Sequence, residues 1–228
     1  MERDLRQISL AQGTVIYEPG ATLDTIYFPQ GGLISLLVVT KEGGSIETAT
    51  VGREGAVGLH AAIGRRRSFT LATTQIAGRF SIIRAARFEQ IAADSRAVRE
   101  LIARYTELLW AEAQQAAACN AVHDAASRLC RWLLQCADRI GSETVPLTQE
   151  FLAQMLGVRR TTVTLLAQTM QKKGLIKYSR GHIAILDRAA ISACACECYH
   201  VLHADRLPAA IGISLEAHSG GGKTNGRV

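Results

Sequence analysis

The sequence of 228 residues has no long hydrophobic run. Each apolar stretch is interrupted well before the ~20 residues that a membrane-spanning helix requires. The first segment, MERDLRQISLAQG, has no apolar core of the signal-peptide type, so we expect a cytoplasmic chain without a membrane partner. Thiols stay reduced in that compartment, and the six cysteines are therefore expected to be free rather than paired in disulfides.

Grouped catalytic residues are also lacking. His60 is the one histidine in the first 120 residues, whereas a metal-dependent barrel enzyme needs a cluster of histidines and carboxylates. No Ser-His-Asp or Cys-His pair stands at a recognisable motif. We therefore expect a protein that is not an enzyme, with a barrel-based enzyme as a remote alternative.

The strongest local pattern lies between residues 147 and 187. Thr148 is a good N-cap for a first helix, and Gly157 can adopt the left-handed conformation that ends it. A second helix is expected over residues 160–173. The alternating segment that follows turns tightly at residues 179–182, which predicts a two-stranded wing.

Residue spacing within this segment is that of a helix-turn-helix. Ala153 is small enough for two helices to cross closely, Gly157 supplies the turn, and Val163 is a buried β-branched residue that holds the second helix on the first. Seven Lys or Arg and two acids between residues 148 and 188 give a formal charge of +5, nearly the +6 of the whole chain. Such gathered charge favours double-stranded DNA as the partner. A unit used only for protein contacts is the plainer alternative.

The rest of the chain divides into a β part and a helical part. Short apolar runs separated by turn signals predict strands from about residue 14 to residue 84, in a small barrel or jelly roll. Ser95 can then cap a helix of about 25 residues, whose apolar stripe advances in steps of three and four, as in a coiled coil. We interpret it as a dimer helix. A helix that packs only on its own barrel is the alternative.

This order of a β-barrel, a long helix and a winged helix-turn-helix resembles the CRP/FNR family of bacterial transcription regulators. The resemblance covers residues 10–190. It is carried by the stretches IYFPQGG and VGREGAVGL and, more specifically, by residues 147–186. It implies a homodimer in which a signal at the barrel reorients two recognition helices toward a palindromic DNA site. RNA polymerase is a further partner that the resemblance allows.

The resemblance also implies the fold class and the division of the chain. We expect an α+β fold with an N-terminal antiparallel β-roll or jelly roll. The expected segments are a cyclic-nucleotide-binding-like effector domain at residues 10–94, a dimerisation helix at 95–122, a winged helix-turn-helix domain at 123–207 and a flexible tail at 208–228.

Family positions that face DNA transfer unevenly to this sequence. Arg160 matches the position whose guanidinium reads guanine, whereas Thr161 stands where the family usually has Glu. Leu165 stands where a well-known member has a second base-reading Arg, so a different half-site is expected. Arg159 replaces a usual Ser at the N-cap and gains a charge for phosphate. The predicted DNA-binding residues are Arg159, Arg160, Thr161, Thr162, Thr164, Leu165, Lys177, Arg180 and His182.

The cyclic-nucleotide cassette of the family, a Gly-Glu pair with a later Arg-Ser or Arg-Thr, is only half present. Gly58 is followed by Leu59, which cannot accept the hydrogen bond that the family's Glu takes from the ribose hydroxyl. Arg67 and Ser68 keep the pair that holds the phosphate. These four residues are the predicted effector pocket. The effector is unknown, and cyclic AMP should bind weakly or not at all.

Cysteine placement bears on a second hypothesis. No cysteine precedes Cys119, so the N-terminal group that holds an iron–sulfur cluster in some relatives is absent. Cys194, Cys196 and Cys198 are weak metal candidates, because on one helix from 188 to 207 Cys196 would point away from the other two. We expect small, partly buried thiols and no metal. A redox- or metal-responsive regulator that senses through these three cysteines is the alternative function.

Overall fold

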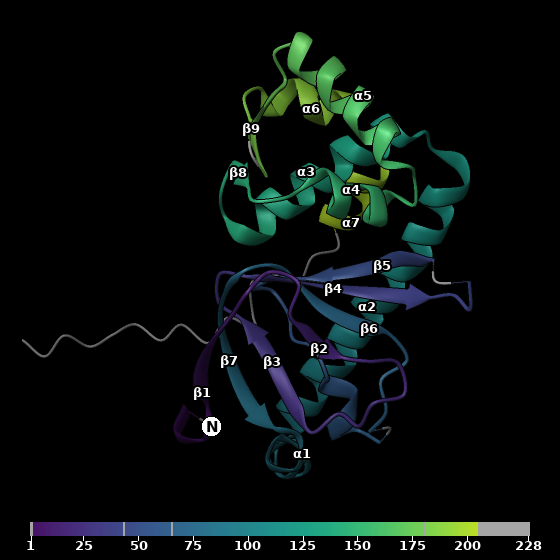
Figure 1. Cartoon of the computed structure of the whole chain (residues 1–228). Coiled ribbons are helices and arrows are strands. Elements are labelled where there is room, and N and C mark those ends of the chain that lie inside the picture. The colour runs from purple at the N-terminus through teal and green to yellow at the C-terminus, as the bar shows by residue number, and fades with distance from the viewer. Residues whose placement is uncertain (1, 43, 65, 180, 205–228) are drawn as a thin grey trace, which may run out of the picture.

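The computed structural model describes residues 2–204 except 43, 65 and 180. The predicted tail at 208–228 and the predicted wing residue Arg180 therefore lie outside the described residues. A β-roll forms one half of the molecule, and the helix-turn-helix forms the other (Figure 1). The long helix α2 (Arg96–Val122) runs along the roll toward the second half.

The N-terminal half is an antiparallel β-roll of two sheets, as predicted. One sheet has the strand order β2-β6-β4-β5, and the other has the order β1-β7-β3. Ile26, Ile34 and Phe80 are fully buried in the core of the roll. The strands are β1 (Arg6–Leu10), β2 (Val15–Tyr17), β3 (Thr25–Pro29), β4 (Leu33–Val39), β5 (Ser45–Val51), β6 (Leu71–Ile76) and β7 (Gly78–Arg84).

Strand β1 precedes the region in which the sequence predicts strands. It lies at the edge of its sheet and pairs only with β7. Ile8 and Leu10 are half-buried, and the residues beside them are exposed. An edge strand has one partner and a partly solvated face, so its sequence carries a weaker apolar signal than that of a central strand.

Side-chain caps begin the helices close to where the sequence predicts them. The Ser95 hydroxyl accepts a hydrogen bond from the backbone N–H of Val98 at 3.3 Å and begins α2. The Asp124 carboxylate accepts from two backbone N–H groups and begins the next helix, which Gly141 ends at a φ of 70°. That helix is α3 (Ala125–Ile140), and α1 (Ala85–Asp94) precedes α2.

One face of α2 packs on its own chain. Gly55 of the roll permits the close approach, since a Cβ atom there would lie 2.0 Å from Tyr105 Oη. The buried residues of α2 are Ile102, Tyr105, Glu112 and Cys119. These four residues form the intramolecular face of the helix, and the dimer helix expected at residues 95–122 stays a prediction.

The C-terminal half is a winged helix-turn-helix followed by two short helices. Its three-stranded sheet has the order β8-β10-β9. The elements are β8 (Thr144–Val145), α4 (Gln149–Leu156), α5 (Arg160–Lys172), β9 (Ile176–Ser179), β10 (His182–Ile185), α6 (Arg188–Cys194) and α7 (Cys198–Ala204). The prediction of a single terminal helix from 188 to 207 was wrong, because α6 and α7 are separate helices. Ala195 is extended, at φ −71° and ψ 149°, because the chain turns there to bury Cys196.

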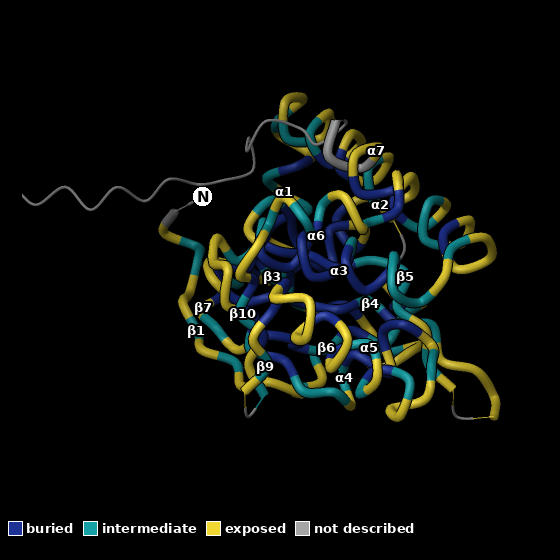
Figure 2. Tube along the Cα trace, turned by 90° about the horizontal axis from the view of Figure 1, so that it is seen from above, coloured by how far each residue is buried: buried dark blue, intermediate teal, exposed yellow. Residues whose placement is uncertain are grey.

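The two halves share an apolar core around α3. Leu33 and Ile76 of the roll belong to the same cluster of buried side chains as Leu134 of α3 and Leu152 of α4. Buried residues are concentrated along α3 and the neighbouring β4 and β6, while exposed residues lie toward the outside (Figure 2). The helix-turn-helix is therefore docked on the roll as well as joined to it through α2 and α3.

Candidate nucleic-acid interface

Local sequence signals form the turn between α4 and α5 as predicted. The Thr148 hydroxyl accepts a hydrogen bond from Phe151 N–H at 3.3 Å and caps α4. Gly157 ends α4 at a φ of 62°, a conformation that favours glycine. Ala153 and Val163 are both buried at the contact between the two helices. These residues set the angle at which α5 is presented.

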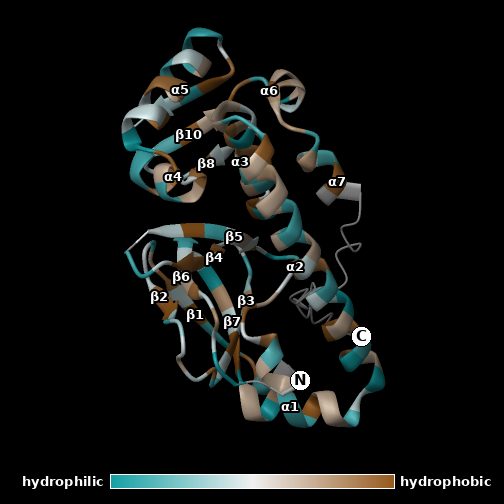
Figure 3. Cartoon of the chain, turned by 90° about the vertical axis from the view of Figure 1, so that its right-hand side faces the viewer, coloured by the Kyte–Doolittle hydropathy of each residue, from teal (hydrophilic) through white to brown (hydrophobic). Residues whose placement is uncertain are grey.

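Helix α5 divides into a buried face and an exposed face. Val163, Ala167 and Met170 point into the core. Arg159, Arg160, Thr161, Leu165 and Gln168 are exposed. Leu165 keeps 65% of its surface exposed, so its side chain lies on the outer face of the helix. Helix α5 lies on the outside of the second half of the molecule (Figure 3).

Two of the three threonines predicted to contact DNA are less exposed than the third, Thr161. Thr162 and Thr164 are half-buried. The Thr164 hydroxyl donates a hydrogen bond to Gln149 Oε1 at 2.8 Å, so it ties α5 to the start of α4. This contact gives Thr164 a positioning role in the structure.

The predicted wing is present and is joined to α5. Strands β9 and β10 pair antiparallel, with Lys177 opposite Ala184 and His182 opposite Ser179. Lys177 and His182 are exposed. The Tyr178 backbone N–H donates to Gln171 Oε1 at 2.9 Å, a link between the end of α5 and the wing that the sequence patterns did not single out.

The hairpin between β4 and β5 lies next to the beginning of α5. Gln154 Nε2 of α4 donates to Ser45 Oγ of the roll at 2.6 Å. A cleft of about 890 Å³ separates the hairpin from α5, and its lining includes Thr40, Arg159 and Arg160. The roll thus reaches the same end of α5 that carries the arginines.

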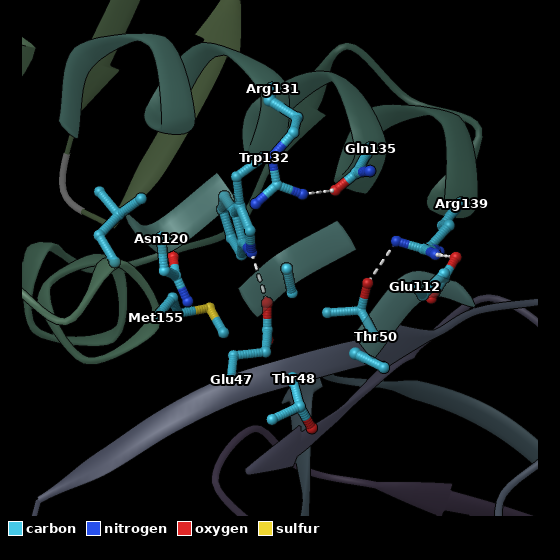
Figure 4. A pocket seen from close by; sticks show the side chains of 13 residues that line it. Glu47, Thr48, Thr50, Glu112, Asn120, Arg131, Trp132, Gln135, Arg139 and Met155 are labelled. Atoms are coloured by element: carbon cyan, nitrogen blue, oxygen red, sulfur yellow. Dashed lines mark hydrogen bonds and ion pairs between the residues drawn. The ribbon is translucent and has the colours of Figure 1, made fainter. Parts of the chain in front are cut away.

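A buried polar cluster joins the roll to α3. The Glu47 carboxylate of β5 accepts a hydrogen bond from Trp132 Nε1 at 2.8 Å (Figure 4). It also accepts from Ser35 Oγ at 2.6 Å and from Gln75 Nε2 at 3.2 Å. Although Glu47 as a residue is only half-buried, burial of this carboxylate raises its pKa to about 7, against the lowering effect of the bonds from Ser35 and Trp132. A cavity of about 30 Å³, large enough for a water molecule, lies beside it.

Arg139 of α3 connects three parts of the chain in the same region. Its guanidinium lies against Glu54 of the roll at 2.8 Å and against Glu112 of α2, and it donates to Thr50 of β5. Arg139 is only 4% exposed and Glu112 is 7% exposed. The two carboxylates stabilise the charged guanidinium, whose pKa is raised even though burial acts in the opposite direction.

The predicted effector residues lie on both sides of the segment 22–25. Gly58 has a φ of 92° and approaches Thr25, while Arg67 pairs with Thr22. Leu59 is buried in the core of the roll. The Ser68 hydroxyl donates to the Thr70 carbonyl at 2.6 Å, and Arg67 is exposed.

The three C-terminal cysteines separate into two groups. Cys194 is exposed, whereas Cys196 and Cys198 turn inward beside Cys119 of α2 and beside His123, the residue that follows α2. This corrects the expectation that Cys196 points away from Cys198. The sequence offered one signal for the missed pair, because Cys119 and His123 stand four residues apart on a predicted helix.

Two family models match the chain in the order of its two halves. Residues 7–95 match the cyclic nucleotide-binding domain, and residues 127–194 match the Crp-like helix-turn-helix domain. The chain belongs to the CRP/FNR family of transcription regulators. Members of this family are regulators and not enzymes. In the described residues, no helix is long and apolar enough to cross a membrane.

Solved structures of CRP/FNR proteins have the same fold. FixK2 from Bradyrhizobium japonicum superposes with a TM-score of 0.73 at 15% identity, over 84% of this chain and 98% of that one. TTHA1359, a CRP/FNR regulator from Thermus thermophilus, gives 0.66 at 23% identity, over 83% and 98%. The c-di-GMP-responsive regulator CLP of Xanthomonas campestris gives 0.65 at 15% identity, over 81% and 95%. No curated protein sequence matches this chain.

Proposed function

We propose that this CRP/FNR protein is a homodimeric, sequence-specific DNA-binding regulator whose helix α5 enters the major groove. The observation that carries the proposal is the division of α5. Val163, Ala167 and Met170 form the buried face of the helix. The exposed face presents two arginines at the N-terminal end of the helix. Recognition helices of helix-turn-helix proteins contact base edges with this end.

The exposed residues suit two kinds of contact. Arg160 would donate two hydrogen bonds to guanine O6 and N7, and Thr161 would contact a neighbouring base. Leu165, exposed on the same face, is suited to a thymine methyl group. Arg159, Thr162, Lys177 and His182 would hold backbone phosphates, and Thr164 would position α5 through Gln149. Arg180, which lies outside the described residues, is proposed as a further phosphate contact on the basis of the sequence alone.

The outer face of α2 supports the homodimer. Trp110 is 68% exposed and Val122 is 72% exposed, on the side of α2 that does not pack on the roll. Ala117 and Ala118, which are also exposed, would let a second copy of the helix approach closely. A two-fold pair would present two α5 helices to half-sites about one DNA turn apart, roughly 34 Å.

Regulation by a signal at the roll has a physical route in this arrangement. The β4–β5 hairpin contacts α4 through Ser45 and Gln154 and borders the arginine end of α5. Arg139 ties the roll, α2 and α3 together. A ligand that shifts the roll would therefore change how α5 is presented. Leu59 argues against cyclic AMP as this ligand, because its side chain cannot accept a hydrogen bond.

The test is selection of random duplex DNA by the purified protein without added ligand, followed by sequencing. We expect an enriched palindrome with half-sites about one turn apart. Ser45→Ala and Gln154→Ala, which break the hairpin contact, should leave the palindrome unchanged and alter only affinity. Absence of any enriched sequence, with and without added nucleotides, and binding that simply weakens with salt would contradict specific recognition.

A further inference from the structure

Four metal-ligating side chains from distant parts of the chain meet at the end of α2. Cys119 lies in the last turn of α2, and His123 caps its C-terminal end. Cys196 lies in the extended link between α6 and α7, and Cys198 begins α7. The Sγ atoms of the three cysteines and a ring nitrogen of the histidine all lie within 4.8 Å of one another. All three thiols are buried, and they form an apolar cluster separate from the two main cores.

The spacing of these atoms fits the edges of a tetrahedron around zinc. Zn–S bonds of about 2.3 Å and a Zn–N bond of about 2.0 Å place two sulfurs about 3.8 Å apart, and a sulfur and a nitrogen about 3.5 Å apart. Cys119 Sγ and Cys196 Sγ are 3.6 Å apart, as are Cys198 Sγ and His123 Nδ1. The longest edges would need to shorten by only about 1 Å, which side-chain rotation can supply.

The surroundings orient the histidine in the way that metal sites require. His123 Nε2 lies 3.0 Å from Glu197 Oε1, an acceptor, so Nε2–H donates a hydrogen bond to the carboxylate. In the neutral imidazole, Nδ1 then keeps a lone pair on the side of the cysteines. This carboxylate–histidine pairing is the usual second layer of a metal site. Gln115 Nε2 also donates to Cys198 Sγ at 2.9 Å. Arg131, on the facing helix α3, acts electrostatically on Cys119 and Cys196 and would offset the charge of three thiolates.

We propose that Cys119, His123, Cys196 and Cys198 form a tetrahedral site for zinc or a similar thiophilic divalent cation. Three thiols and one imidazole are a ligand set of structural zinc sites, and on binding the three thiols release their protons to solvent. The bound ion fastens α7 to the end of α2, beside the junction with α3. Neither family model covers these ligands, since one match ends at residue 95 and the other spans 127–194. The site does not depend on DNA binding.

The experiment uses the full chain, reduced and purified without chelator. We expect elemental analysis to find one zinc per chain. The metal-free protein should take up one equivalent of Co²⁺, with thiolate charge-transfer absorption and the visible bands of tetrahedral cobalt. Cys119→Ser and Cys198→Ser should weaken Co²⁺ binding at least tenfold. The matched control is Cys194→Ser, because Cys194 is exposed and outside the group, and it should bind as the unchanged chain does.

His123→Ala keeps the test informative if a cysteine variant fails to fold, because His123 is only half-buried. This variant should fold, as judged by circular dichroism, but its melting temperature should no longer rise with added Zn²⁺. The proposal is wrong if the reduced protein takes up no Co²⁺ with thiolate charge transfer. It is equally wrong if Cys194→Ser loses binding as Cys119→Ser does, or if mass spectrometry shows only free thiols or a Cys119–Cys196 disulfide and no metal.

Discussion

Arginines serve opposite purposes in two regions of this molecule. At the contact between the roll and α3, Arg139 is buried, and its charge is matched by Glu54 and Glu112. At the start of α5, Arg159 and Arg160 are exposed and lie on the face that is free of the core. The tryptophans differ in the same way, since Trp132 is 3% exposed and Trp110 is 68% exposed. The comparison teaches that the setting of a side chain, rather than its type, separates structure from recognition.

Among the variants, replacement of the buried Arg139 should have the largest effect on stability. Arg139→Ala leaves the buried carboxylate of Glu112 and the partly exposed carboxylate of Glu54 without their partner, and it should lower the free energy of unfolding by about 3–5 kcal/mol. Arg160→Ala removes an exposed charge and should change that free energy by less than about 0.5 kcal/mol. Urea unfolding of the two variants measures the difference. Similar losses for both would break the comparison.

The exposed tryptophan should matter for assembly and not for folding. Trp110→Glu places a charge in the centre of the proposed dimer face and should weaken dimerisation by about 30-fold or more, as loss of a central aromatic anchor does. The matched control is Phe69→Glu, which alters another exposed aromatic residue, on the roll. Sedimentation over a dilution series gives the dimer constants. A monomeric wild type, or an equal effect of Phe69→Glu, would count against α2 as the interface.

Glu47 makes the buried contact sensitive to pH. Burial raises the pKa of its carboxyl from 4.5 to about 7, so the folded chain keeps a proton that the unfolded chain has released. The contribution of Glu47 to the stability of the folded chain is therefore complete below about pH 4.5 and is lost as the pH rises through 7. Arg131 and Arg139 face the carboxylate and limit the shift. The urea midpoint should fall between pH 5 and pH 8, and it should fall less in Glu47→Gln. Parallel pH profiles for the two proteins would contradict this assignment.

The smallest expected effect is that of cyclic AMP. Leu59 is buried and cannot accept a hydrogen bond, and the Ser68 hydroxyl is engaged by the Thr70 carbonyl. Calorimetry should show no binding tighter than about 10 μM, equivalent to about −7 kcal/mol. Binding tighter than that would restore the family's nucleotide pocket to this chain.

Local signals in the sequence predicted the helix-turn-helix well. Thr148 and Gly157 act through hydrogen bonds and backbone angles within a few residues, so their effect can be read without the rest of the fold. The contacts of Arg139 could not be predicted, because its partners Glu54 and Glu112 stand 85 and 27 residues away in the sequence. The meeting of Cys119 with Cys196, 77 residues apart, depends in the same way on tertiary packing that breaks the terminal helix at Ala195.

The most direct test of the central claim compares Arg160→Ala with Lys177→Ala on the selected palindrome and on a set of sites that each carry one base-pair change. Arg160→Ala should lose about 1–3 kcal/mol on the palindrome and become indifferent to the base at one position of each half-site. Lys177→Ala should weaken binding to all sites alike and reduce the salt dependence. An equal loss on every site for Arg160→Ala would contradict the claim that α5 reads the sequence through this arginine.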